Sequence, residues 1–106
     1  MAIYLVTKLN NGKRNTYLCN ATSPSSTLSI PGEYIQISYA NTDNVFNMNS
    51  GLSIYNVIYF DGEGTKQNVY ISESSFDSVF EFFKRNYGIT NFLSINKTDY
   101  VWYELR

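Results

Sequence analysis

The chain has 106 residues and a mass of 12.2 kDa, a length typical of one domain, so we predict a single domain over residues 1–106. Its formal net charge is −1, from eight basic and nine acidic side chains, which argues against a polyanion-binding surface. The sequence has no histidine and one cysteine. This excludes histidine bases, Cys–His nucleophile pairs, zinc sites built from histidines or several cysteines, and an intrachain disulfide.

The first predicted elements are two strands joined by a tight turn. Residues 2–9 and 13–20 have strand composition and flank Asn10-Asn11-Gly12. Asn-Gly is the strongest short-range signal for a two-residue hairpin. With that turn, Val6 lies opposite Tyr17, and apolar residues fall on both faces of the pair. We therefore expect a hairpin that is covered on both sides, or one that keeps a face for a partner.

A polar connection over residues 20–32 ends in the turn dipeptide Pro31-Gly32. Residues 33–40 then alternate between polar and apolar side chains with a period of two, which predicts a half-buried strand.

The next segment, residues 41–51, is rich in asparagine and has no strand or helix period. It nevertheless contains Val45, Phe46 and Met48. Such an apolar tip is either folded back as a plug or exposed for contact with a partner. Because contiguous exposed apolar residues mark interaction sites, we take these three residues as candidate partner-binding residues.

A second hairpin is predicted from residues 52–60 and 67–72 around the loop Asp61–Lys66. The loop superficially resembles a phosphate-binding loop, but its lysine does not follow a glycine and it leads into a strand. The acidic residues Asp61, Glu63 and Glu73 lack the spacing of a glycosidase pair or a calcium loop. We therefore predict a solvated turn, no metal, no organic cofactor and no catalytic residue.

After this hairpin the apolar period changes from 2 to 3.6 residues, which predicts one helix over about residues 75–87. Ser74 or Ser75 suits the N-cap, and Gly88 suits the position after the C-cap. The apolar stripe consists of Phe76, Val79, Phe80 and Phe83. We expect Phe80 and Phe83 to point into the core.

Two short strands, residues 89–95 and 100–105, follow the helix. The predicted class is α+β: a mainly antiparallel sheet of about five to seven strands with one helix packed on one face. The last strand carries large aromatic side chains that could anchor a partner, since Trp and Tyr are over-represented among such anchors. We therefore add Tyr100, Trp102 and Tyr103 to the candidate partner-binding residues.

Tyr, Ser, Asn and Gly together make up 41 of the 106 residues, and these residue types dominate protein-binding paratopes. We therefore predict a non-enzymatic module that binds a protein partner. The first alternative is a virion or assembly component that acts through homo-oligomeric contacts. The second is a protein that stacks single-stranded nucleic acid on an aromatic sheet face, although the dispersed basic residues disfavour nucleic acid as a partner.

Residues 70–83, a strand that ends in Ile-Ser-Glu-Ser and runs into a short helix, resemble a segment of small phage-encoded anti-CRISPR inhibitors. The resemblance implies a phage or mobile-element protein that blocks a host defence complex by occluding its surface. The near-neutral charge does not fit DNA mimicry, and we carry no functional residue over from the family.

The expected location is the cytoplasm, and the host cytoplasm if the protein is encoded by a phage. The single Cys19 fits a reducing compartment. The N-terminal residues lack the basic region of a secretory signal and are too short to span a bilayer, so we expect no membrane association.

Overall fold

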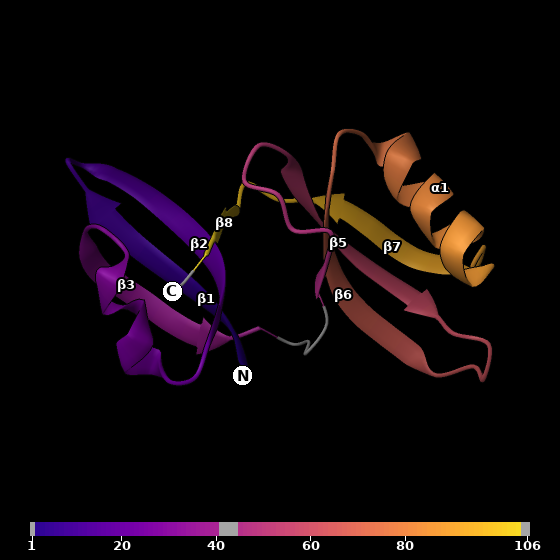
Figure 1. Cartoon of the computed structure of the whole chain (residues 1–106), viewed down its shortest axis with the longest axis horizontal. Coiled ribbons are helices and arrows are strands. Elements are labelled where there is room, and N and C mark those ends of the chain that lie inside the picture. Colours follow the sequence, from indigo (N-terminus) through magenta and orange to yellow (C-terminus); the bar gives the residue numbers. More distant parts are fainter. Residues whose placement is uncertain (1, 41–44, 105–106) are drawn as a thin grey trace. The chain divides into compact units, whose positions relative to one another are not determined.

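The computed structural model describes residues 2–40 and 45–104 (Figure 1). The chain divides into two compact units. The first comprises Met1–Asp43 and Asp99–Arg106, and the second comprises Asn44–Thr98. The class is α+β as predicted, but the strands are divided between two four-stranded sheets where the sequence analysis expected one. Residue alternation identifies a strand without saying which sheet it joins, because the same period of two serves every sheet.

The sheet of the first unit has the strand order β3-β1-β2-β8, and its strands are β1 (Ala2–Asn10), β2 (Lys13–Ala21), β3 (Glu33–Tyr39) and β8 (Val101–Tyr103). β1 is antiparallel to β2 and β3, whereas β8 is parallel to β2. The predicted hairpin is confirmed, with Val6 opposite Tyr17. At its turn Asn11 and Gly12 both have positive φ, 53° and 77°, as a turn of type I′ requires.

The core of the first unit lies on one face of this sheet, where a short 3-10 helix, η1 (Pro24–Ser29), is followed by the buried Ile30. The buried members of this core are Tyr4, Val6, Cys19, Ala21 and Ile30. On the opposite face of the hairpin, Ile3 and Leu18 are buried as well. Both faces of the hairpin therefore carry buried apolar residues, as the sequence pattern predicted.

The sheet of the second unit has the order β4-β6-β5-β7, and its strands are β4 (Val45–Phe46), β5 (Ser53–Phe60), β6 (Lys66–Glu73) and β7 (Phe92–Lys97). β5 and β6 form the predicted second hairpin. β7 is antiparallel to β5, and the two-residue β4 is parallel to β6.

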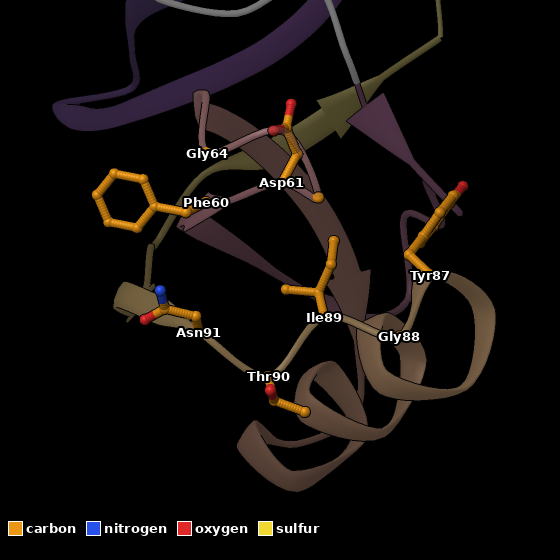
Figure 2. A pocket seen from close by; sticks show the side chains of 9 residues that line it. Phe60, Asp61, Gly64, Tyr87, Gly88, Ile89, Thr90 and Asn91 are labelled. Atoms are coloured by element: carbon orange, nitrogen blue, oxygen red, sulfur yellow. The ribbon is translucent and has the colours of Figure 1, made fainter.

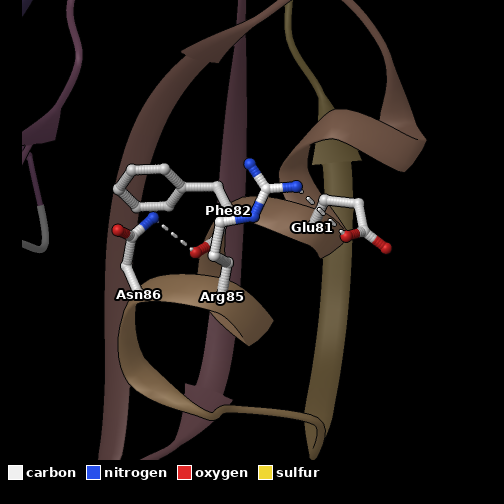
Figure 3. A network of polar contacts seen from close by, with 4 residues as sticks. All are labelled: Glu81, Phe82, Arg85 and Asn86. Carbon is white, nitrogen blue, oxygen red and sulfur yellow. Dashed lines mark hydrogen bonds and ion pairs between the residues drawn. The ribbon is translucent and has the colours of Figure 1, made fainter.

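The predicted helix is α1 (Phe76–Tyr87). Ser75 is the N-cap, and its hydroxyl accepts a hydrogen bond of 3.2 Å from the Ser78 amide. Gly88 ends the helix in the left-handed conformation, with a φ of 66°. Two polar contacts lie on its exposed side (Figure 3): the Asn86 side-chain amide donates to the Phe82 carbonyl at 2.9 Å, and Arg85 pairs with Glu81 at 3.9 Å. Within residues 2–40 and 45–104, no helix is long and apolar enough to cross a membrane.

α1 packs on one face of the second sheet, where Val79 and Phe83 are fully buried among strand residues that include Tyr55, Val57, Tyr59, Val69 and Ile71. The prediction for Phe83 is confirmed. The prediction for Phe80 is wrong, because its side chain is 43% exposed. Its ring lies 4.7 Å from that of Phe92, on the edge strand β7, and β7 is the last strand on that side of the sheet. Phe80 therefore lies at the margin of the helix–sheet contact.

Candidate protein-binding site

An apolar groove of about 290 Å³ lies in the first unit, between η1 and the edge strand β3. It is lined by Pro24, Ser25, Leu28, Tyr34 and Ile37. Leu28 is 69% exposed, Tyr34 40% and Ile37 37%. A single exposed apolar side chain is ordinary on a soluble protein, but several that share one hollow are typical of an interaction site.

The exposure of β3 corrects the sequence analysis. A strand was predicted there and is present, but every residue of β3 except Ser38 is exposed, where a half-buried strand was expected. The reason is its position at the edge of the sheet, where β1 is its only neighbouring strand among the described residues. Tyr39 shows the effect: its ring stacks on that of Tyr4 at 4.9 Å between centroids, and its side chain is still 67% exposed.

An irregularity in the pairing of β3 with β1 determines which side chains reach the groove. Thr7 pairs with Gln36, but the next β1 residue, Lys8, pairs with Tyr34, so Ile35 is an extra residue in β3. Without this bulge, Tyr34 would share a face with Gln36. With it, Tyr34 lies on the same side as Ile37 and lines the groove.

Tyr34 is held in place by two contacts, one to its ring and one to its hydroxyl. The Lys8 ammonium lies 3.5 Å from the centroid of its ring, a cation–π contact, and Lys8 is only 2% exposed. The Tyr34 hydroxyl is hydrogen-bonded to the buried Thr27 hydroxyl, which also donates to the Pro24 carbonyl at 2.6 Å. An aromatic ring fixed in advance loses little conformational entropy on binding, so Tyr34 suits the role of an anchor.

Gly32 fixes where β3 starts. Its φ is +107°, and a Cβ built on it would lie 2.7 Å from the Leu9 carbonyl oxygen. The backbone therefore approaches β1 more closely than any side chain at this position allows. The Lys8 ammonium also donates to the Gly32 carbonyl at 3.4 Å, so the same lysine contacts both the turn and the ring of Tyr34.

The predicted tip, Val45, Phe46 and Met48, lies in the second unit and is half-buried. Val45 and Phe46 form β4, and the Phe46 ring packs against Phe82 and Phe83 with centroids 5.8 Å apart in each case. The Met48 sulfur accepts a hydrogen bond of 3.5 Å from the Ser72 hydroxyl. Of the two alternatives, the structure shows a tip that is folded back against its own unit.

The C-terminal candidates, Tyr100, Trp102 and Tyr103, lie in the first unit and are also half-buried. The Trp102 indole donates to the Glu104 carboxylate at 2.6 Å. The Tyr103 ring packs edge-on against Tyr17, with centroids 5.7 Å apart, and its hydroxyl donates to the Ser29 carbonyl at 3.3 Å. Their role in partner binding stays a prediction, and none of them lines the groove between η1 and β3.

A larger, open cleft of about 630 Å³ lies in the second unit. Figure 2 shows that its lining comes from the end of β5 and the turn after it, and from the end of α1 and the segment after it. Asp61 is the only acidic residue of that lining, and its carboxylate accepts from the amides of Thr65 and Glu63, each at 2.9 Å, and from the Gln67 side chain at 3.1 Å. These hydrogen bonds, with that from Thr65 the largest cause, hold the pKa of Asp61 below its ordinary value. The carboxylate therefore accepts hydrogen bonds from residues of its own turn and from the start of β6.

The single cysteine lies in the core of the first unit. Cys19 is fully buried, and burial raises the pKa of its thiol to about 11, so it stays protonated at neutral pH. Among the described residues, no three acidic or cysteine side chains gather into a cluster that could hold a metal ion. No family model, curated protein or solved structure matches the chain.

The sequence did not predict the groove, because its two walls, η1 and β3, have unrelated sequence patterns. Leu28 lies in a polar connection, where one leucine between serines and threonines gives no helical period. Tyr34 and Ile37 fit the alternation of a strand whether that strand is central or at an edge. The one signal that could have pointed here is the low charge of residues 33–39, which include Glu33 and no other charged side chain.

Proposed function

We propose that this chain is a non-enzymatic protein-binding module whose partner docks on the groove between η1 and β3. The observation that carries this proposal is the concentration of exposed apolar side chains around a fixed tyrosine. Leu28 and Ile37 line the groove together with Tyr34, whose ring contacts Lys8 and whose hydroxyl is hydrogen-bonded to Thr27. An interface of this kind has an aromatic anchor near its centre and apolar side chains that exclude water around it.

The finer proposal is that the partner is a host defence complex whose surface this protein occludes in the host cytoplasm. It is supported by the resemblance of residues 70–83 to phage-encoded inhibitors. In the fold this segment forms the end of β6 and the first part of α1. It lies in the second unit, so the resemblance concerns a different part of the chain from the groove.

The experiment compares two matched variants, Leu28→Asp in the groove and Leu93→Asp in the second unit. Both leucines are largely exposed, 69% and 57%, so either substitution leaves the cores intact. The tagged wild-type chain and both variants are used to capture proteins from a lysate of the host cell. We expect a partner that wild type and Leu93→Asp retain and that Leu28→Asp loses at least tenfold. Equal retention by both variants contradicts the groove, and identification of a partner outside any defence complex contradicts the finer proposal.

A further inference from the structure

β3 has a free outer edge. It is a terminal strand of the order β3-β1-β2-β8, and β1 is its only pairing partner among the described residues (Figure 1). Edge strands are normally protected against pairing by short length, by lysine or proline, or by a bulge. β3 is seven residues long, and Glu33, its first residue, is its only charged residue. The bulge at Ile35 leaves residues 36–39 regularly paired with β1.

The hydrogen bonds of this edge can be assigned from its pairing with β1. Tyr4 lies opposite Tyr39, and the Ala40 amide donates to the Ile3 carbonyl at 2.9 Å. Ile3 and Ala40 lie opposite each other next to Tyr4 and Tyr39. Because hydrogen-bonded and non-hydrogen-bonded pairs alternate, Tyr4 and Tyr39 are not hydrogen-bonded to each other. Because bonding alternates along an antiparallel pair, Ile37 and Tyr39 direct their amides and carbonyls away from β1. These groups form a template for a further strand.

We propose that this strand is β3 of a second copy of the chain, paired antiparallel about a twofold axis at Ile37. In that register Ile37 lies opposite the second copy's Ile37, and the two exchange the outward-directed amide and carbonyl bonds. Gln36 lies opposite the second copy's Ser38, and Tyr39 opposite its Ile35. Polar residues thus meet polar residues, and aromatic meets β-branched, the combinations that stabilise neighbouring strands.

Three properties of β3 favour a copy of itself over another protein as occupant. Ile37, whose amide and carbonyl point away from β1, lies at the twofold axis, so the same pair of backbone hydrogen bonds is made by both copies. No like charges face each other over residues 35–39, which are all uncharged. The net charge of −1 also gives two copies almost no long-range repulsion.

The pairing would bring the two grooves together. The twofold axis is perpendicular to the sheet, so rotation about it does not exchange the two faces of the sheet. η1 of both copies therefore lies on the same face of the extended sheet. Tyr34 and Ile37 of each copy then line neighbouring grooves across the axis. Because the contact consists of one short strand from each copy, it lies at the small end of protein interfaces, and we expect a dissociation constant on the order of micromolar. This association does not depend on the partner proposed above.

The first test measures molecular mass against protein concentration by light scattering or sedimentation for wild type, Ile37→Lys and Leu93→Lys. We expect wild type to move from the 12.2 kDa monomer towards the dimer as concentration rises. Ile37→Lys should stay monomeric, because it places like charges opposite each other, whereas Leu93→Lys on the other sheet should behave as wild type. Tyr39→Lys, at a 67% exposed position, serves as a second disrupting variant if Ile37→Lys alters the circular dichroism spectrum. A wild type that is monomeric throughout, or a dimer that both β3 variants retain, overturns the proposal.

The second test measures the register by disulfide formation. Ile37→Cys should form a covalent dimer under mild oxidation, because the two substituted residues face each other, within the distance that a disulfide spans. Gln36→Cys should remain monomeric, because residue 36 lies opposite Ser38 of the second copy and not opposite the second copy's residue 36. The native Cys19 is fully buried and does not compete. Faster cross-linking of Gln36→Cys than of Ile37→Cys overturns this register. Leu28→Asp should still dimerise, which separates this proposal from partner binding.

Discussion

The two sheets are covered to different extents. In the second unit the 12-residue α1 lies along one face and buries Val79 and Phe83 completely. In the first unit the cover is η1, six residues long, and its Leu28 is 69% exposed. The helix reaches across its sheet, whereas η1 ends before the edge strand β3 is covered. The second unit also keeps exposed apolar side chains, such as Phe76 and Leu93, but the shorter cover of the first sheet leaves Leu28, Tyr34 and Ile37 exposed around one groove.

Phe83→Ala tests the better covered sheet and should have the largest effect. The ring is fully buried and lies 5.2 Å from that of Tyr59, so its removal leaves a cavity between helix and sheet. We expect a loss of about 3–5 kcal/mol in the free energy of unfolding, measured by denaturant titration. Phe80→Ala is the matched control. Because Phe80 is 43% exposed, we expect a loss of only about 1–2 kcal/mol.

The same titration tests the prediction of a single domain. Trp102 is the only tryptophan and lies in the first unit, so its fluorescence follows that unit. Circular dichroism of α1 follows the second unit. If residues 1–106 form one domain, Phe83→Ala should shift both transitions equally. A shift in the helical signal with unchanged Trp102 fluorescence would show two independently folding units and contradict that prediction.

Gly32→Ala tests how the first unit holds β3 without a long helix. The substitution places a Cβ 2.7 Å from the Leu9 carbonyl oxygen at a φ of +107°, so the start of β3 must move. We expect a loss of about 1–3 kcal/mol by thermal or denaturant unfolding. Gly12→Ala is the control, since its φ is also positive but its Cβ would meet nothing within 4 Å. Equal losses for the two variants would contradict a role for the close approach to β1.

The fold was predictable where local signals agreed. Ser75, the apolar row through Val79 and Phe83, and Gly88 all indicate one helix, and α1 begins and ends where they place it. The first hairpin followed in the same way from its Asn-Gly turn. These features depend on residues that lie close together in the chain, so local sequence patterns are enough to predict them.

Features that depend on distant residues could not be predicted. The division into two sheets depends on which strands pair, and β8 joins β2 from across the chain. The exposure of β3 depends on its place at an edge, and the position of Tyr34 depends on one extra residue in β3. The sequence did not decide whether the tip folds back or stays exposed, because this depends on the packing of Phe46 against α1.

Tyr34→Phe tests whether the groove is a fixed surface. The substitution keeps the ring over the Lys8 ammonium and removes only the hydroxyl that contacts Thr27. We expect a loss of about 1 kcal/mol in the free energy of unfolding, as for one hydrogen bond. Tyr87→Phe, at a 55% exposed tyrosine of the second unit, is the control and should leave stability nearly unchanged. Identical stability of Tyr34→Phe and wild type would contradict the anchoring of this ring.

The smallest expected effect concerns the pH dependence of the β5–β6 turn in the second unit. The pKa of Asp61 is lowered from 3.8, chiefly by the hydrogen bond from the Thr65 amide. A lowered pKa in the folded state means that the unfolded chain takes up the proton first as the pH falls. The ionised carboxylate therefore stabilises the fold fully above about pH 5, and this contribution declines through pH 3.8 towards the lower pKa of the folded state. Asp61→Asn should be less stable than wild type at neutral pH, and the difference between the two should shrink on acidification, measured by denaturant titration at several pH values. The other carboxylates cancel in this difference because both proteins carry them. A difference that stays constant from neutral to acid pH would show that the charge of Asp61 adds nothing to the turn.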